Sequence, residues 1–484
     1  MEPSLPGLLV LLALLAVGRR LGGAIVIGLF ISLPFGSTAI ATLSALGGSS
    51  PLIYVAFVVL LLASVVLRRG FADRLGLVLR RCSTARIVGA LIVCSIAGTV
   101  LLPRLFLGQT AVPVPSPDGV KDLPLAPTSA NFTQTGYFVL GALAYYAFAI
   151  LLVSKGQLEA LRRGFLACAV VQASLGAIDL AGKLSGLGDL LLPIRTATYT
   201  YLVDVEEAGF WRIAGGFSEA SIFGSVTLAC LAFSFAYWRG TRSRPALVLT
   251  LVLLCLLLLS TSSTAYTGFA IVALFAAVSM VISAMRGRLS GQDLLVLAFV
   301  WLALIVVLSL YLFDEQIFDP VVQLFESMVL NKATSASAEA RFHWNAQSMQ
   351  AFYDTFGLGV GLGSSRASSW LVAVLSQLGI PGTLLMASLV GVLLRDMIAA
   401  KPQHVDRRTL ALVSGARASA LASLAGASVS GAFADPGLLF FISLAVVDAC
   451  RRGELARPTR AVPAFAAAPA ISMGPAPPGP PPIA

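Results

Sequence analysis

The chain has 484 residues, of which 57% are hydrophobic and only 12% are charged, and its mean hydropathy is +0.89. Soluble domains carry about 25% charged residues, so a single water-soluble core is excluded. The net charge of +10 comes from short basic clusters between apolar blocks, without a nucleic-acid-binding motif, and no nucleic-acid partner is expected.

Apolar blocks follow one another along the chain, and a bilayer-crossing helix needs about 20 mostly apolar residues. Helices are expected because each backbone polar group in lipid must be satisfied within the chain. The sequence therefore predicts an all-α polytopic membrane protein with about thirteen transmembrane helices, the first two short. The expected spans are 5–17, 21–37, 51–67, 87–102, 136–153, 164–182, 214–238, 246–261, 265–285, 293–313, 369–394, 409–430 and 436–450.

These spans form a membrane domain at 1–452, followed by a tail at 453–484 that is rich in Ala and Pro. Such a composition predicts a disordered segment. The first apolar block has no basic residues before it and no clear cleavage site after it, so it is interpreted as a retained helix.

One set of alternate loops holds about three times as many Lys and Arg residues as the opposite set. This bias predicts a multi-pass protein of the bacterial inner membrane, with the N-terminus outside and the C-terminus in the cytoplasm. Three outside segments are long: 103–135, 183–213 and 314–368. The first is rich in Pro and is expected to be an extended surface loop. The last is too long for a passive connection, which usually has about 2–8 residues, so it is expected to be functional.

Basic residues are rare on the predicted outer face, and four arginines there lie close to helix ends: Arg195, Arg212, Arg341 and Arg366. A guanidinium group is a permanently charged planar fork that suits phosphate oxygens. A lipid pyrophosphate would lie at the same depth. The alternative interpretation is ordinary solvated charge or contact with lipid headgroups.

Glu219 lies in the segment RIAGGFSEASIFG, where the predicted helix begins near Gly215. A carboxylate in or near a membrane is costly and usually functional, although Ser218 and Glu219 could also be first-turn residues of a helix. Asp179 and Arg417 are the other charges in predicted spans, and a structural ion pair is the favoured interpretation for both. Arg417 lies in a run of small residues suited to tight helix packing.

His343 is the only histidine on the predicted outer face, and its neighbour Trp344 suits a sugar or a lipid. Histidine could act as a general base, or it could be a surface residue beside a helix start. A single histidine does not make a zinc site, and no metal is expected. The run GLGVGLGSSR at 357–366 includes Gly359 and Gly361, which would let the backbone approach a ligand or an anion.

Three stretches of the sequence are similar to motifs of one family. The first has Arg341, Trp344, Phe352, the alternating glycines of 357–361, and LGIPG at 378–382. The second is RIAGGFSEAS at 212–221, and the third is LLLLSTSSTAY at 256–266. Together they resemble the O-antigen ligase and polymerase family.

The chain departs from this family at two places. Ser368 and Ser369 stand where ligase members carry His-Asn, and Ser263 stands where the third motif has Arg. The missing histidine favours the polymerase members of the family over the ligases, and it leaves the general base unassigned.

The resemblance implies a lipid-dependent (GT-C-like) membrane glycosyltransferase that acts on polyprenyl-pyrophosphate-linked oligosaccharides. Arg212, Arg341 and Arg366 would stabilise the leaving pyrophosphate, and Glu219 would activate the acceptor hydroxyl or orient an arginine. No metal or cofactor is then expected. The expected partners are the lipid-linked oligosaccharide, the bilayer and a chain-length regulator.

The candidate catalytic residues are therefore Glu219, Arg341 and His343. The candidate substrate-binding residues are Arg195, Arg212, Trp344, Gly359, Gly361, Arg366, Ser368, Ser369 and Arg417. The alternatives are a ligase that transfers lipid-linked glycan to another acceptor, a transporter or flippase of lipid-linked sugars, and a non-catalytic assembly partner.

Overall fold

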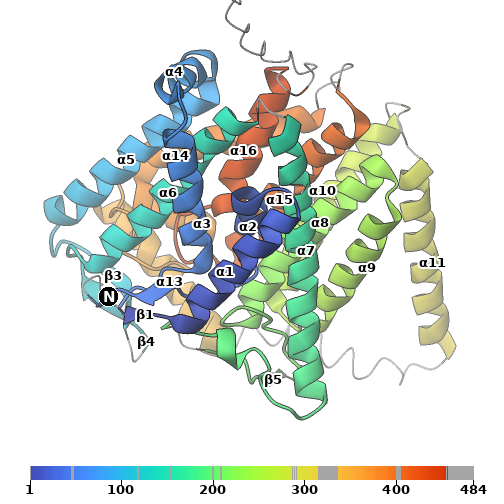
Figure 1. Ribbon diagram of the computed structural model, residues 1–484. Coiled ribbons are helices and arrows are strands. Elements are labelled where there is room, and N and C mark those ends of the chain that lie inside the picture. The colour runs from blue at the N-terminus through green and yellow to red at the C-terminus, as the bar shows by residue number, and fades with distance from the viewer. Residues whose placement is uncertain are drawn as a thin grey trace, which may run out of the picture.

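The computed structural model describes residues 2–44, 48–116, 119–152, 155–198, 201–207, 210–285, 287, 289, 291–313, 336–398, 405–453 and 455. Within these ranges the chain is a bundle of helices, to which three two-stranded antiparallel pairs are added (Figure 1). The segment 314–335 of the long predicted loop and nearly all of the predicted tail lie outside the described residues.

Seven helices in the described part of the chain are long and apolar enough to cross a membrane, or eight if one bent pair is counted as a span. These helices are α5 (Ser83–Leu105), α6 (Ser129–Leu151), α7 (Lys155–Leu184), α8 (Ala220–Thr241), α10 (Ser263–Met285), α14 (Trp370–Ile398) and α15 (Arg407–Ser430). The prediction of an all-α chain with several apolar helices is confirmed, and such helices indicate a multi-pass membrane protein.

The other predicted spans also coincide with helices, but most of these are short. They are α1 (Leu5–Arg20), α2 (Ala24–Ser32), α3 (Ile53–Val66), α9 (Arg244–Leu259), α11 (Gly291–Phe313) and α16 (Leu438–Arg451). The shortest, α2, has 9 residues and rises about 14 Å, less than half of a hydrocarbon core of about 30 Å. The count of thirteen spans therefore stays a prediction.

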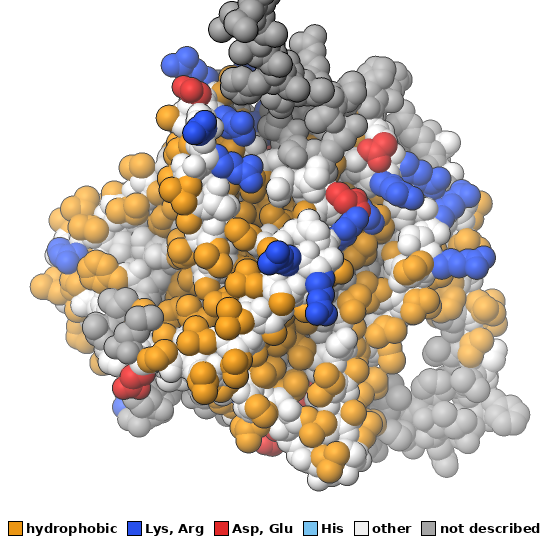
Figure 2. All heavy atoms as spheres, in the orientation of Figure 1, with side chains coloured by type: hydrophobic (Ala, Val, Ile, Leu, Met, Phe, Trp, Pro, Cys, Tyr) orange, Lys and Arg blue, Asp and Glu red, His pale blue; other side chains and the backbone are white. Residues whose placement is uncertain are grey.

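Apolar side chains fill the interior and also cover the outside of the helices. Phe30, Phe138 and Phe440 are fully buried, whereas Val93 is 67% exposed and Leu274 is 65% exposed. Figure 2 shows apolar side chains over most of the visible face of the bundle. A helix surface of this kind is stable in lipid and would aggregate in water.

Two helices lie where the sequence predicts loops: α4 (Phe71–Arg81) and α13 (Ala336–Asp354). Both mix apolar and polar residues, so neither forms an apolar block. The chain turns by 102° between α3 and α4. Gly70 makes this turn at a φ of 72°, a left-handed conformation that favours glycine.

The Pro-rich segment 103–135 is extended only in its middle. There β3 (Ala111–Ser116) and β4 (Gly119–Pro124) form an antiparallel hairpin. The prediction is wrong at both ends of the segment, because α5 continues to Leu105 with Pro103 in its last turn, and α6 begins at Ser129. In the last turn of α5, Pro103 removes a single i→i−4 hydrogen bond, the one that an N–H group at this position would donate to the Thr99 carbonyl. The other strand pairs are β1 (Glu2–Pro3) with β2 (Ala41–Thr42), and β5 (Glu206–Glu207) with β6 (Phe210–Trp211).

Helices α8 and α15 pack antiparallel through small residues. A Cβ atom on Gly240 would lie 2.6 Å from the Ala411 side chain, and one on Gly426 would lie 2.9 Å from Ser225 Oγ. Larger side chains at these glycines would separate the two helices. The prediction of tight packing along the small-residue run of α15 is therefore confirmed.

The bundle has two different ends. One carries the β3–β4 and β5–β6 hairpins and α13, and is called the hairpin end (Figure 1). The other carries α4 and the C-terminal end of α16, and is called the basic end because most of the Lys and Arg side chains on the visible face gather toward it (Figure 2).

Candidate functional site

Two glycine-containing segments at the hairpin end, the run at 357–363 and LGIPG at 378–382, form one structural unit. Helix α14 is interrupted at Gly379, where φ is 64° and ψ is −171°, and Pro381 has no N–H group to donate. The freed carbonyl groups of Ser376 and Gln377 accept hydrogen bonds from the backbone N–H groups of Val360 (2.8 Å) and Gly361 (3.0 Å). The glycine-rich loop thus replaces the helical hydrogen bonds that the break removes, as a membrane interior requires.

Gly359 and Gly361 serve this packing rather than a ligand. Both have a φ of 85°. A Cβ atom on Gly359 would lie 2.7 Å from the Gly379 nitrogen, and one on Gly361 would lie 3.0 Å from the Gly98 carbonyl oxygen of α5. Their N–H groups donate to Thr355 Oγ1 and to the Gln377 carbonyl. These contacts with protein remove both glycines from the set that we expect to touch a ligand.

Replacing Gly379 with alanine should destabilise the protein by about 2–5 kcal/mol. Its dihedral angles lie in a region that is essentially restricted to glycine, and a Cβ atom would lie 2.2 Å from the Leu358 carbonyl oxygen. The thermal unfolding midpoint in detergent measures the effect. Gly136→Ala in α6 is the matched control, since no atom lies within 4 Å of a Cβ there. Equal midpoints for the two variants would contradict this account of the loop.

Helix α13 presents two faces to two neighbours. Trp344 and Asn345 face the loop before α14, because the Trp344 ring lies 5.1 Å from the Arg366 guanidinium carbon and Asn345 Oδ1 accepts from the Ser368 N–H at 2.8 Å. Arg341 is three residues before Trp344 and shares this face. His343 lies two residues after Arg341, on the opposite side of the helix.

The opposite face of α13 is attached to the β3–β4 hairpin. His343 Nε2 lies 2.6 Å from the Asp122 carboxylate, and Gln347 donates to the Ala111 carbonyl at 3.0 Å. The His343 side chain is 56% exposed. The structure therefore places His343 on the other side of α13 from Arg341 and gives it a carboxylate partner in the hairpin, and its catalytic role stays a prediction.

Arg341, Trp344, Arg366 and Glu219 form the arginine–glutamate cluster, which draws on α13, the loop before α14 and the start of α8. Burial lowers the pKa of the Arg366 guanidinium; the negative charge of Glu219 opposes this shift, and the positive charge of Arg341 adds to it. These effects place both charged groups near Arg366. Among the described residues, the buried Nε–H group of Arg366 has no hydrogen-bond partner. An unsatisfied buried donor of this kind requires an acceptor.

Glu219 occupies the N-cap position of α8. Helix α8 begins at Ala220 rather than near Gly215 as predicted, because the glycines before it form a turn. The Glu219 side chain makes no capping hydrogen bond to the backbone and accepts one from the Ser221 hydroxyl. Its half-buried carboxylate therefore stays available to the arginine beside it.

A buried set of charges holds the segment 212–219 in place. The Asp179 carboxylate accepts from Lys183 Nζ (3.0 Å) and from the N–H groups of Ala214 (2.7 Å) and Gly215 (3.0 Å). Lys183 Nζ also donates to the Arg212 carbonyl at 2.6 Å. The side chains of Asp179 and Lys183 are 1% and 3% exposed. The favoured interpretation of Asp179 as a structural ion pair is thus supported.

Arg195 belongs to the same clamp. Its guanidinium group donates to Asp189 (2.7 Å), to the Gly215 carbonyl (2.8 Å) and to the Phe217 carbonyl. The side chain is 2% exposed. We therefore assign Arg195 to positioning the segment that ends at Glu219, and not to contact with a substrate as expected from the sequence.

The remaining candidates lie at different depths. Ser369 precedes α14, where its carbonyl accepts from the Ala373 N–H at 2.9 Å, and Ser368 is buried next to it. Both are close in sequence to Arg366. Arg417 lies in the middle of α15, which reaches the hairpin end at Ser430. The helical rise between these residues places Arg417 about 20 Å from that end. The structure thus does not bring Arg417 to the arginine–glutamate cluster.

A second carboxylate at this end, Asp435, was not singled out from the sequence. It lies in the turn between α15 and α16, and this turn contacts the Arg366 loop because the Ala367 N–H donates to the Ala432 carbonyl at 3.1 Å. Burial raises the pKa of the Asp435 carboxyl, and a hydrogen bond from the Gly437 N–H opposes this shift. Such a raised pKa is frequent at catalytic sites. The sequence feature that could have identified Asp435 is its position directly before the predicted span 436–450.

The third motif lies beside α8. The turn between α9 and α10 buries Ser260, Thr261 and Ser262, and Thr264 in the first turn of α10 is also buried. Ser262 Cβ would lie 3.6 Å from a Cβ atom on Gly224, about one turn after Glu219. The third stretch therefore lies beside the start of α8, at a position three residues after the end of the second stretch.

No protein-family model matches the chain, and no curated protein matches it. The geometry of the hairpin end is therefore the main support for any functional assignment.

Proposed function

We propose that this chain is a membrane glycosyltransferase that polymerises polyprenyl-pyrophosphate-linked oligosaccharide repeat units into an O-antigen or exopolysaccharide. In this proposal the hairpin end faces the periplasm of a bacterial inner membrane, and the bundle is a GT-C-like scaffold. The observation that carries it is the arginine–glutamate cluster with the unsatisfied Arg366 donor. The motif resemblance is the second support.

The cluster suits the departure of a pyrophosphate group. A hydroxyl oxygen of the acceptor sugar forms the new bond to the anomeric carbon of the growing chain, and the bond from that carbon to the lipid pyrophosphate breaks. The leaving pyrophosphate takes the bonding electrons, and the hydroxyl proton goes to a carboxylate. Arg341 and Arg366 would stabilise the charge that develops on the leaving oxygens, and Trp344 would contact a sugar ring or lipid.

Glu219 and Asp435 divide the remaining roles in this proposal. Glu219 is electrostatically coupled to Arg366, so it would orient that arginine. Asp435 would accept the proton, because its raised pKa makes it a stronger base than an ordinary carboxylate. Arg212 begins the clamped segment and would add a further positive charge near the pyrophosphate.

The test is complementation of a deletion strain with the wild type or with Arg341→Ala, with membrane insertion checked by blot. Lipid-linked and surface glycans are separated on a gel. We expect Arg341→Ala to accumulate single lipid-linked repeat units and to lose long chains. The control is Arg104→Ala, which removes an exposed arginine whose guanidinium donates to its own helix, at the Val100 carbonyl.

Other outcomes would contradict the proposal. Long chains that remain on the carrier lipid in the deletion strain would indicate a ligase. Lipid-linked units trapped on the cytoplasmic face would indicate a transporter. Unchanged glycans in Arg341→Ala would exclude a role for the arginine–glutamate cluster in polymerisation.

A further inference from the structure

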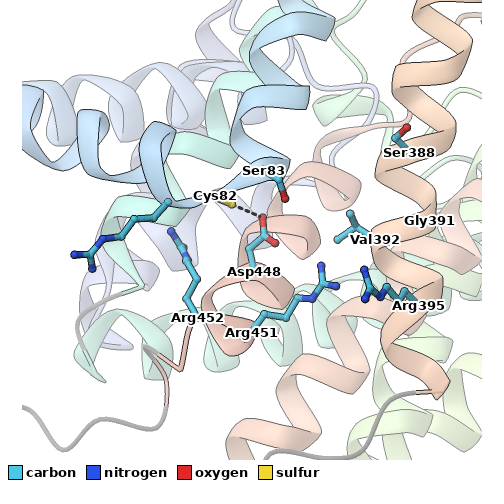
Figure 3. A pocket seen from close by; sticks show the side chains of 10 residues that line it. Cys82, Ser83, Ser388, Gly391, Val392, Arg395, Asp448, Arg451 and Arg452 are labelled. Carbon is cyan, nitrogen blue, oxygen red and sulfur yellow. Dashed lines mark hydrogen bonds between the residues drawn. The ribbon is translucent and has the colours of Figure 1, made fainter.

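A cavity of about 390 Å³ lies at the basic end, near the C-terminal end of α14, whereas Arg366 of the arginine–glutamate cluster precedes the start of this helix. Figure 3 shows the cavity from close by. Its walls come from the junction of α4 and α5, the second half of α14 and the end of α16. The charged residues that line it are Arg81, Arg395, Asp448, Arg451 and Arg452. Guanidinium groups therefore outnumber carboxylates four to one in this lining.

The carboxylate among the described lining residues, Asp448, is held by hydrogen bonds on its own side of the wall. Asp448 accepts from Tyr145 Oη (2.6 Å), Thr84 Oγ1 (3.0 Å) and Cys82 Sγ (3.2 Å). Asp448 is 4% exposed, and Figure 3 shows its contact with Cys82. The carboxylate is thus held against the α4–α5 junction and α6, and the arginines remain the larger part of the charged lining.

Two of the arginines face each other across the cavity. Figure 3 shows the side chains of Arg395, from α14, and Arg451, from α16, pointing toward one another. Two guanidinium groups that line one cavity favour an anion between them. A phosphate group matches two guanidinium forks in charge and geometry.

The position of α4 identifies the source of that phosphate. Leu77 is 46% exposed and Leu79 is 36% exposed on this helix, which also carries Arg74, Arg80 and Arg81. An amphipathic basic helix that turns sharply from a span lies in the headgroup layer of a bilayer. The mouth of the cavity lies at the end of α4, and hence at the depth of lipid headgroups.

We propose that this cavity binds the phosphate group of an anionic phospholipid and thereby ties together the ends of α4, α14 and α16. The site is distinct from the proposed polymerase site, and its test does not depend on polymerase activity. Basic pockets between helices on a cytoplasmic face are a known mode of anionic lipid binding.

The experiment uses the full chain purified in a neutral detergent. Phosphatidylglycerol, phosphatidylcholine or inorganic phosphate is titrated, and the unfolding midpoint and the bound lipid, by native mass spectrometry, are recorded. We expect phosphatidylglycerol to raise the midpoint and to stay bound. The Arg395→Ala/Arg451→Ala variant should bind it at least about tenfold more weakly. Arg19→Ala/Arg20→Ala, which removes the same charge at the end of α1, should bind it like the wild type.

A second variant keeps the test decisive if the double variant does not fold. Gly391 lines the cavity, and no atom lies within 4 Å of a Cβ there. Gly391→Leu therefore fills the cavity without removing a charge, and we expect it to lose the bound phosphatidylglycerol. Equal binding by the wild type and by both cavity variants would overturn the proposal. An equal effect of phosphatidylcholine would also overturn it, and an equal effect of inorganic phosphate alone would exclude a lipid as the source.

Discussion

Replacing Asp179 with alanine is expected to lower the free energy of unfolding by about 3–5 kcal/mol and to abolish polymer formation. The change leaves Lys183 and Arg195 buried without their shared partner, whose oxygens lie 3.0 Å and 4.0 Å from them. It also frees the N–H groups of Ala214 and Gly215. The segment that presents Glu219 would then lose its anchor. Chemical unfolding in detergent and the glycan gel measure the two effects.

Glu159→Ala is the matched control on the same helix. Glu159 pairs with Arg162 and Arg163, but its side chain is 41% exposed, and such surface pairs contribute about 0–1 kcal/mol. The double variant Asp179→Ala/Lys183→Met should recover part of the lost stability, because it removes an uncompensated buried charge. If Asp179→Ala unfolds like Glu159→Ala, the clamp does not stabilise the fold.

Most helices of this protein could be predicted from the sequence because a segment in lipid must be apolar and must satisfy its own backbone hydrogen bonds. A run of apolar residues such as 265–285 matches a helix in the structure, here α10 at Ser263–Met285. Helices α4 and α13 escaped prediction because their residues are mixed in polarity. Their stability comes from neighbours and interfaces that a local pattern does not contain.

The site was only partly predictable, for a different reason. Arg341, Trp344, Arg366 and Glu219 were selected by residue type, and the structure gathers them. The same reasoning selected Arg195, although its guanidinium group already donates to Asp189 and to the Gly215 and Phe217 carbonyl groups. A sequence shows that an arginine is present, but only the tertiary structure shows whether its donors are already occupied.

The glycine run illustrates the same limit. Alternating glycines predict close approach of a backbone, and close approach is present. The partner is the break at Gly379 in α14 rather than a ligand, because Pro381 leaves a carbonyl without a donor. Both motifs are thus explained by the hydrogen-bonding requirement of one interrupted helix, and this explanation holds whatever reaction the protein performs.

Arg366→Ala is expected to slow polymerisation by about 10²–10³-fold, the usual loss when one stabilising donor is removed from a developing negative charge. Purified protein and lipid-linked repeat units give the rate. Glu219→Gln should also slow the reaction, since an arginine without its carboxylate neighbour is less well oriented. If Glu219 acts through Arg366, the double variant should be no slower than Arg366→Ala alone, because residues that act as a unit are not additive.

The same comparison of single and double variants can be made for Asp435 and Arg366. Asp435→Asn should slow the reaction independently of Arg366, so that the losses multiply in the double variant. A carboxyl group must be ionised to accept a proton, and burial raises the pKa of Asp435. The wild-type rate should therefore rise with pH through that raised pKa, and the rise should be absent in Asp435→Asn. Multiplying losses for Glu219→Gln with Arg366→Ala, together with an unchanged pH profile in Asp435→Asn, would instead make Glu219 the proton acceptor.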